Sequence, residues 1–189
     1  MELGGKSPCI IDKGADLAYT ASKMAFSCFF NFGQTCTRPD YILIDYTLVG
    51  KFVDELKTKM KTLHNDGKSI DLLGNAINDF HHERLCALFK DHQGTVVIGN
   101  VNAHIDKDLQ PSVILNPSAD SPLMKDEIFG PIVPIITVKN IDEAIDFINN
   151  RPKPLATYYY GSNSRWNTNL NKVEKQTSSG AFVVNDSCT

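Results

Sequence analysis

Short apolar runs alternate with segments of helical periodicity along most of the chain. The runs have the length of β-strands and span 7–12, 40–45, 95–98, 113–115, 132–138, 155–160 and 181–184. Between them, apolar residues recur three and four positions apart, which is the period of an amphipathic helix. Strands that alternate with helices indicate βαβ units. We therefore predict an α/β fold, with a mostly parallel sheet, helices on both of its faces, and a single domain over 1–189.

The helices can be bounded by their start and stop residues. The first is predicted to begin near Ala15 and to end at Asn31-Phe32-Gly33, because Gly33 can adopt the left-handed conformation that ends many helices. Its apolar stripe consists of Leu17, Ala18, Ala21, Met24, Ala25, Cys28 and Phe29. Further helices are predicted over 48–63, 78–92 and 165–175, with a turn at 65–68. Another begins at Asn140, which is spaced to form a capping box with Glu143.

Composition and charge exclude several classes of protein. Apolar residues make up 42% of the chain and charged residues 22%, which is typical of a globular protein. The net charge is −3 and there is no basic block, so nucleic-acid binding is not expected. No apolar run reaches the 18 or so residues that span a bilayer, and the N-terminus lacks the apolar core of a signal peptide. We expect a cytoplasmic protein.

One of the five cysteines stands apart from the others. Cys9 lies in a predicted strand, Cys28 and Cys86 lie on predicted helices, and Cys188 is near the end of the chain. Cys36 lies in a loop, where a thiol can face a cleft and where backbone N–H groups can stabilise a thiolate or an oxyanion. Its position alone is also compatible with an unreactive loop cysteine.

The sequence contains no pattern that predicts a metal site. There is no C-x-x-C, so neither a zinc ribbon nor a thioredoxin motif is supported. His81 and His82 are neighbours on a predicted helix, where adjacent side chains point about 100° apart and do not form a two-ligand clamp.

Two further tracts carry candidate chemistry. Glu2-Leu3-Gly4-Gly5-Lys6 places a carboxylate beside paired glycines, which let another molecule approach the backbone closely. It matches neither phosphate-loop pattern. Lys125-Asp126-Glu127-Ile128-Phe129-Gly130-Pro131 places two acids before an aromatic residue and a turn. By itself the second tract is equally consistent with a capped turn that leads into the strand at Ile132.

Together, the three tracts resemble those of the aldehyde dehydrogenase family, in the same order. The resemblance rests on E-L-G-G-K-S-P at 2–8, F-F-N-F-G-Q-T-C at 29–36 and D-E-I-F-G-P at 126–131. It continues through 143–149, 151–156 and 177–180, stretches that are most similar to the class-three branch, which includes fatty-aldehyde enzymes.

The resemblance implies a role for each matched residue. Cys36 would be the nucleophile that attacks the aldehyde carbon, and Glu2 the base that activates water for deacylation. Glu127 would hold the nicotinamide ribose of NAD or NADP, Phe129 would pack beside the nicotinamide, and the backbone of Gly4 and Gly5 would lie close to that ring. The expected substrate is an aldehyde with a medium- or long-chain aliphatic or an aromatic group, and the full-length form is expected to be a homo-oligomer.

The chain also departs from the family's pattern. The family's chains are longer, so the dinucleotide-binding half and the closing C-terminal segment are expected to lie outside these 189 residues. The segment alone is therefore expected to be inactive, and any membrane-attaching tail would lie beyond Thr189. Arg38 occupies a position where a small residue is common. Two alternative functions stay open: a cysteine hydrolase or esterase without a cofactor, and a non-enzymatic partner of a full-length subunit.

Overall fold

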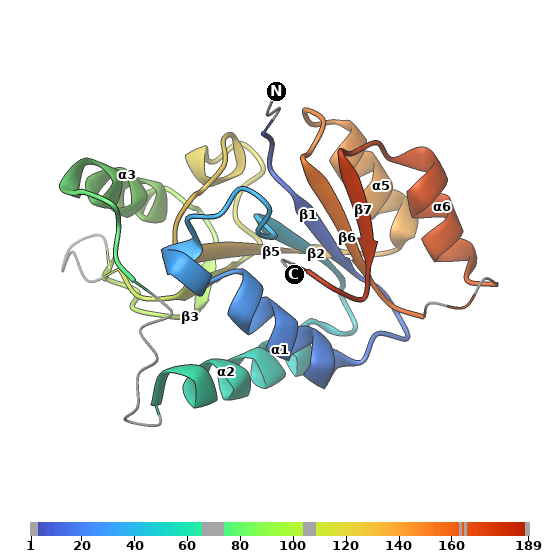
Figure 1. Ribbon diagram of the computed structural model, residues 1–189, viewed down its shortest axis with the longest axis horizontal. Coiled ribbons are helices and arrows are strands. Elements are labelled where there is room, and N and C mark those ends of the chain that lie inside the picture. The colour runs from blue at the N-terminus through green and yellow to red at the C-terminus, as the bar shows by residue number, and fades with distance from the viewer. Residues whose placement is uncertain (1–3, 66–73, 104–108, 163, 165, 188–189) are drawn as a thin grey trace.

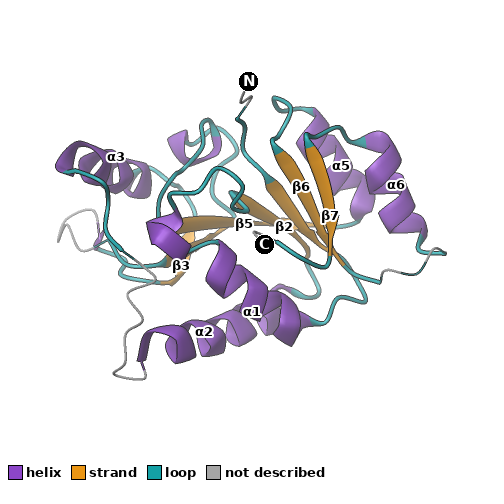
Figure 2. Cartoon of the chain, viewed as in Figure 1, coloured by secondary structure: helices purple, strands orange, loops and turns teal. Residues whose placement is uncertain are grey.

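A computed structural model of the protein describes residues 4–65, 74–103, 109–162, 164 and 166–187. Seven strands of this part of the chain form one sheet, in the order β3-β4-β5-β2-β1-β6-β7 (Figures 1 and 2). Their bounds are β1 Pro8–Ile11, β2 Tyr41–Asp45, β3 Thr95–Ile98, β4 Ser112–Leu115, β5 Ile132–Val138, β6 Ala156–Tyr160 and β7 Ala181–Val184. β3 and β4 are antiparallel and every other pair is parallel, which confirms the predicted fold class.

Helices cover both faces of this sheet. They are α1 Leu17–Ser27, α2 Val49–Asn65, α3 Asp79–Lys90, α5 Ile141–Asn149 and α6 Thr168–Gln176, with short 3-10 helices η1 Phe30–Gly33 and η2 Pro122–Met124. The hydrophobic cluster on one face contains residues of α1 and α2, and the cluster on the other contains residues of α5 and α6. A third cluster packs Leu85 and Phe89 of α3 against the start of β5.

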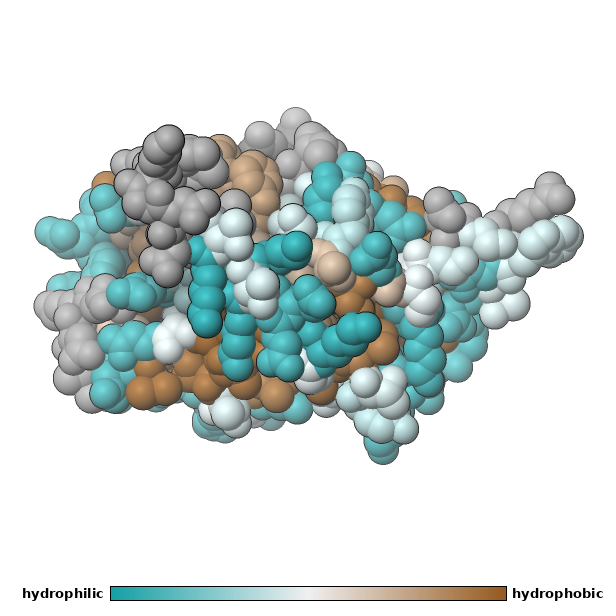
Figure 3. All heavy atoms as spheres, turned by 90° about the horizontal axis from the view of Figure 1, so that it is seen from below, coloured by the Kyte–Doolittle hydropathy of each residue, from teal (hydrophilic) through white to brown (hydrophobic). Residues whose placement is uncertain are grey.

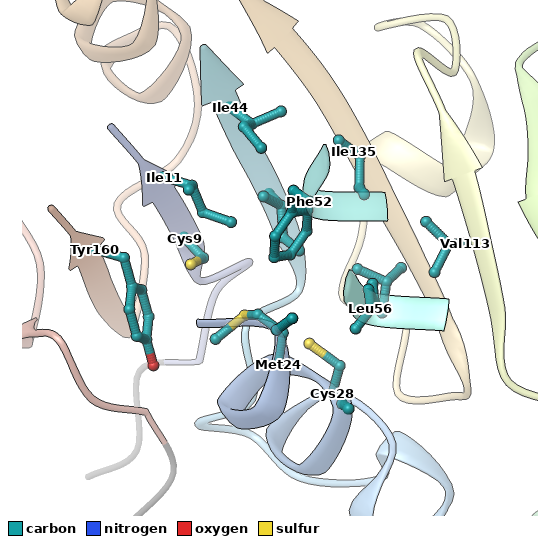
Figure 4. Packing of buried hydrophobic residues seen from close by; sticks show 14 of the residues in the cluster. Cys9, Ile11, Met24, Cys28, Ile44, Phe52, Leu56, Val113, Ile135 and Tyr160 are labelled. Atoms are coloured by element: carbon teal, nitrogen blue, oxygen red, sulfur yellow. The ribbon is translucent and has the colours of Figure 1, made fainter. Parts of the chain in front are cut away.

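The core beneath α1 and α2 contains two of the five cysteines. Figure 4 shows Met24 and Cys28 at the end of α1 and Phe52 on α2 directed toward the strands, where they meet Cys9 and Ile44. All of these side chains are buried. Because a free thiol behaves as a small hydrophobic group, the burial of Cys9 and Cys28 fits a packing role.

The first helix ends earlier than its apolar periodicity predicts. α1 stops at Ser27, and the predicted end at Gly33 belongs instead to η1, where Asn31 and Phe32 have positive φ angles. Gly33 does adopt a positive φ of 71°. The predicted stripe is also wrong at one place, since Ala18 is exposed and Thr20 is buried. The positive φ angles break the helical hydrogen-bond pattern, and the chain then turns sharply toward Cys36.

The capping box predicted at α5 forms in a modified way. The side chain of Asn140 accepts a hydrogen bond from the N–H of Glu143 at 3.0 Å, as expected of an N-cap. The carboxylate of Glu143 accepts its bond from the N–H of Lys139 at 2.7 Å, one residue before the cap. The predicted turn at 65–68 lies for the most part outside the described residues.

The outer surface on the side of α2 carries both hydrophilic and hydrophobic residues. Figure 3 shows this face, with hydrophilic side chains in a band across hydrophobic ones. Lys51, Lys57 and Lys61 on α2 are among the exposed residues. No helix of the described residues is long and apolar enough to cross a membrane.

Candidate active site

The three tracts singled out in the sequence meet at one edge of the sheet. Gly4-Gly5-Lys6 precedes β1, the loop of Cys36 precedes β2, and the segment of Glu127 precedes β5. These three strands are parallel and adjacent in the order β5-β2-β1. The amino ends of parallel strands lie at the same edge, so segments far apart in the sequence become neighbours. β1 begins below the N-terminus label in Figure 1, at this edge.

Cys36 is an exposed thiol on that loop. Cys9, Cys28 and Cys86 are buried in the hydrophobic interior, and Cys188 lies outside the described residues. An exposed thiol can reach a substrate, whereas a buried one cannot. The predicted location of Cys36 in a loop, away from the core, is confirmed.

Gln34 fixes the start of this loop. Its amide nitrogen donates to the carbonyl oxygens of Asn31, at 3.1 Å, and Asn75, at 3.0 Å. Its amide oxygen accepts the N–H of Ile77 at 2.9 Å. One side chain thus joins the loop of Cys36 to the segment that leads into α3. This accounts for an amide residue two positions before the thiol.

Glu127 lies against the glycine pair. The N–H of Gly5 donates to Glu127 Oε1 at 2.6 Å. Gly4 and Gly5 have positive φ angles of 44° and 122°. A Cβ at residue 5 would lie only 2.7 Å from the carbonyl oxygen of Lys153, so this close approach requires glycine. The structure thus places Glu127 in direct contact with the glycine pair.

A buried ionic network lies beneath these segments and is centred on Asp40. The carboxylate of Asp40 pairs with the ammonium group of Lys6 and accepts the N–H of Ile128 at 3.1 Å. Lys6 also donates to the carbonyl oxygens of Leu123, at 3.0 Å, and Asp126, at 2.8 Å. Lys6 belongs to the first tract, Asp126 and Ile128 to the third, and Asp40 follows the loop of Cys36, so the network lies where the three segments meet. Burial lowers the pKa of Lys6, and the charge of Asp40 opposes that shift.

A cavity of about 900 Å³ opens beside the network. Its lining includes Gly5, Lys6, Glu127 and Phe129. Phe129 has a positive φ of 46°, a conformation that is uncommon for an aromatic residue and is often found at functional sites. The cavity thus brings together the cofactor-binding residues that the sequence suggested, with the exception of Gly4, which adjoins them.

The sequence did not reveal the contribution of α3 to this cavity. His81 and Arg84 line it, and Arg84 donates to the carbonyl oxygen of Ile128 at 2.6 Å. The two residues are three positions apart, a spacing that places them on one face of a helix. That spacing could have shown that the two side chains share one helix face, but it does not indicate which part of the protein this face contacts. Arg151, which stacks its guanidinium on Phe147 at 3.5 Å, lines the cavity as well.

A second, largely apolar cavity of about 720 Å³ borders the same loop. Thr35 and Thr37, the two neighbours of Cys36, line it together with Phe26, Phe30, Tyr158 and Val183. The hydroxyl of Tyr158 donates to the carbonyl oxygen of Thr37. Gln34 lines the first cavity, so the loop that carries Cys36 borders both.

One expected site residue cannot be examined in the part of the chain that the structure describes. Glu2, the expected base, lies outside the described residues, which begin at Gly4. Within those residues, no cluster of three or more His, Cys, Asp or Glu side chains is arranged to hold a metal ion.

Comparisons with known proteins agree with this arrangement. The model of the aldehyde dehydrogenase family matches residues 1–189. The mouse dimeric NADP-preferring aldehyde dehydrogenase is 39% identical over 187 residues, which are 98% of this chain and 40% of that protein. The family 3 aldehyde dehydrogenase comG of Dictyostelium discoideum is 40% identical over the same length.

A solved structure shares the fold. The substrate-bound state of Staphylococcus aureus AldH superposes with a TM-score of 0.88 at 33% identity, over 99% of this chain and 40% of that one. The chain spans about two fifths of the length of the curated relatives it matches. The match to the family model over all 189 residues and the shared fold establish that this chain belongs to the aldehyde dehydrogenase family.

Proposed function

We propose that the protein containing these 189 residues oxidises aldehydes to carboxylic acids with NAD or NADP, and that they form its thiol-bearing catalytic domain. One observation carries the proposal. Cys36 is exposed on a loop that borders both a cavity lined by Glu127 and Phe129 and a second, apolar cavity. Membership of the family supports aldehyde oxidation in general.

The thiolate of Cys36 is the nucleophile in this proposal. It attacks the aldehyde carbon, a carbon–sulfur bond forms, and the carbonyl oxygen becomes an oxyanion. The N–H of Cys36 is one donor to that oxyanion. Departure of hydride from the tetrahedral carbon restores the carbonyl and leaves a thioester on Cys36. Water then attacks the thioester, the carbon–sulfur bond breaks, and the carboxylic acid is released.

Glu2 is the general base in this proposal, and its role rests on the resemblance of the tract at 2–8. It takes a proton from the attacking water and so makes the water a better nucleophile. Gly4, two residues later, lies close to the carboxylate of Glu127.

The residues present fit a nicotinamide cofactor. Gly5 lines the cavity, and Glu127 offers a carboxylate there that can accept bonds from ribose hydroxyls. Phe129 offers an aromatic ring beside them. The cofactor, when bound, supplies the hydride acceptor. The mouse relative is named NADP-preferring, and for this protein either NAD or NADP is proposed.

The second cavity suggests where the rest of the aldehyde lies. Its aromatic and aliphatic walls favour an apolar chain or ring attached to the carbonyl group. The proposed substrates are therefore medium- or long-chain aliphatic aldehydes or aromatic aldehydes. A charged aldehyde would lose its hydration there without gaining an ion pair.

Absorbance of the reduced cofactor tests the proposal in the complete protein. With a medium-chain aldehyde and NAD or NADP, we expect turnover that Cys36→Ala abolishes and that the matched control Cys86→Ala leaves largely intact. Glu2→Gln should preserve the initial burst of hydride transfer and slow steady turnover, because acylation needs Cys36 and deacylation needs the base. A cysteine–histidine hydrolase would instead cleave esters without a cofactor and would lose that activity in a histidine variant such as His81→Ala.

The 189 residues alone are proposed to be a poor dehydrogenase and to function as part of a homo-oligomer. They span about two fifths of relatives such as the mouse enzyme, which is named dimeric. Calorimetric titration of the isolated chain with NAD should give little heat. Light scattering of the complete protein should give a mass above that of one subunit.

A further inference from the structure

Among the residues that the structure describes, Arg38 is the largest fully buried side chain, with only 2% of its surface exposed. Its guanidinium donates to the carbonyl oxygens of Pro39, at 3.2 Å, Cys28, at 3.3 Å, Ile132, at 2.8 Å, and Gly130. The carboxylate of Asp40 lies 3.8 Å away. An arginine side chain has five N–H donors in a rigid, planar fork, and five acceptors surround this one.

These acceptors come from two separate parts of the site. Cys28 ends α1 and Pro39 belongs to the loop of Cys36, whereas Gly130 and Ile132 follow Phe129 and lead into β5. The guanidinium therefore lies between the segment that carries the thiol and the segment that carries Glu127 and Phe129. The guanidinium binds both segments through their backbone carbonyl groups. A change in its position would therefore move the residues next to those carbonyls, including the thiol-bearing loop.

The packing around the guanidinium leaves little room for adjustment. A Cβ on Gly33 would collide with the carbonyl of Gly130 and with the guanidinium of Arg38. A Cβ on Gly130 would collide with the side chain of Leu85. Gly33 thus lets the two segments approach, Gly130 leaves room for Leu85 of α3, and the fork of Arg38 joins the two segments at a fixed separation.

A buried positive charge alone would not join the two backbone segments at a fixed separation. A lysine would keep the positive charge next to Asp40, but its ammonium is a point charge on a flexible stem and cannot span carbonyls on two segments. An apolar side chain of similar length would fill the space and leave the carbonyls without their donors, which is costly in a buried place. The geometry of the fork distinguishes arginine from both.

We propose that Arg38 is a positioning residue, which sets the place of the Cys36 thiol relative to Glu127 and Phe129 by joining their two backbone segments. The inference rests on the proposed function, in which Cys36 attacks the aldehyde beside a bound cofactor. Reaction requires the reacting atoms to lie about 3–3.5 Å apart, and a displacement of about 1 Å can cost on the order of 100-fold in rate. Loss of the fork should therefore reduce kcat.

The test compares Arg38→Lys and Arg38→Met with Val173→Ala in the complete protein. Val173 is the buried residue of α6 and packs in the cluster on the other face of the sheet, so its truncation lowers stability without touching either segment. We expect both Arg38 variants to lower kcat for the aldehyde by roughly 10- to 100-fold with little change in its KM. Val173→Ala should lower the melting temperature and keep the kcat of the folded protein. In Arg38→Ala, added guanidinium ion well below denaturing concentrations should restore part of the lost kcat.

Other outcomes separate the two proposals. Wild-type kcat in Arg38→Lys, a loss of kcat that only follows the folded fraction, or a failure of guanidinium to restore any activity would each overturn the positioning role. If the wild-type protein oxidises no aldehyde and iodoacetamide does not label Cys36, the proposed function itself fails. If Cys36 is labelled rapidly in the wild type and equally rapidly in Arg38→Met, with unchanged kcat, only the role of Arg38 fails.

Discussion

The N–H of Gly5 donates to Oε1 of Glu127 at 2.6 Å, although the two residues are 122 positions apart in the sequence. The bond joins the glycine tract before β1 to the segment before β5. It holds the carboxylate of Glu127 at the wall of the larger cavity. A charged hydrogen bond of this kind fixes direction as well as position, so Glu127 is held in place for a ligand.

Replacement of this carboxylate should weaken cofactor binding more than it weakens the fold. In Glu127→Gln the amide oxygen can still accept the N–H of Gly5, but the charge is lost. Hydrogen bonds to a charged group contribute about 1.5–3 kcal/mol, so we expect the Kd for NAD or NADP to rise by roughly 10- to 100-fold. Calorimetry on the complete protein measures this. Glu174→Gln, at an exposed position of α6, should leave the Kd unchanged. An equal change in both variants would contradict the role of Glu127.

Cys36 should be the first thiol to react with an alkylating reagent. It is exposed, whereas Cys9, Cys28 and Cys86 are buried. We expect brief treatment with limiting iodoacetamide to label Cys36 on the order of tenfold faster than these three. Peptide mass spectrometry locates the label, and Cys36→Ser should remove most of it. Preferential labelling of Cys86 or Cys9 would show that the loop thiol is not the reactive one.

Gly33→Ala should destabilise the protein strongly. Gly33 has a φ of 71° and a Cβ there would meet the carbonyl of Gly130 and the guanidinium of Arg38. The left-handed conformation alone costs a non-glycine residue about 1–2 kcal/mol, and the collision adds to this cost. We expect the free energy of unfolding, measured with urea, to fall by at least about 2 kcal/mol.

Gly50→Ala provides the matched control for that experiment. Gly50 lies in α2, and a Cβ there would have no neighbour within 4 Å. Alanine is favoured over glycine in helices by up to about 1 kcal/mol, so this variant should be as stable as the wild type or slightly more stable. A similar loss of stability in both variants would mean that the close approach at Gly33 is not the cause.

The protein should lose stability above about pH 10, the ordinary pKa of tyrosine. Burial raises the pKa of Tyr41, Tyr159 and Tyr160 in the folded state. Between the unfolded and the raised folded pKa values, the folded chain binds more protons than the unfolded chain, so the free energy of unfolding falls as pH rises. This contribution is therefore complete below about pH 10 and is lost above it.

Two measurements check this dependence. Urea unfolding at a series of pH values should show the decline, and the ultraviolet absorbance of tyrosinate should rise together with unfolding. Tyr46→Phe is the control and should leave the pH dependence unchanged, because Tyr46 is 59% exposed and does not belong to the core. Smooth ionisation of all the tyrosines while the protein stays folded would contradict the prediction.

The local features of the fold followed from local chemistry. The apolar runs predicted the strands because a strand covered on both faces needs apolar side chains throughout. Asn140 marked a helix start because its side chain accepts a backbone N–H group that a first turn leaves unpaired, and Asn78 proves to cap α3 in the same way. Cys36 was singled out by elimination, since the sequence placed Cys9, Cys28 and Cys86 in regular elements.

Relationships between distant segments depended on the tertiary structure. Parallel pairing of β5, β2 and β1 brings the three tracts to one edge, and the sequence does not state the order of strands in a sheet. For the same reason the contributions of His81 and Arg84 to the cavity could not be foreseen. Arg38 is the clearest case. Its charge suggests an exposed position, and only the carbonyls that converge on it from two segments explain why it is buried.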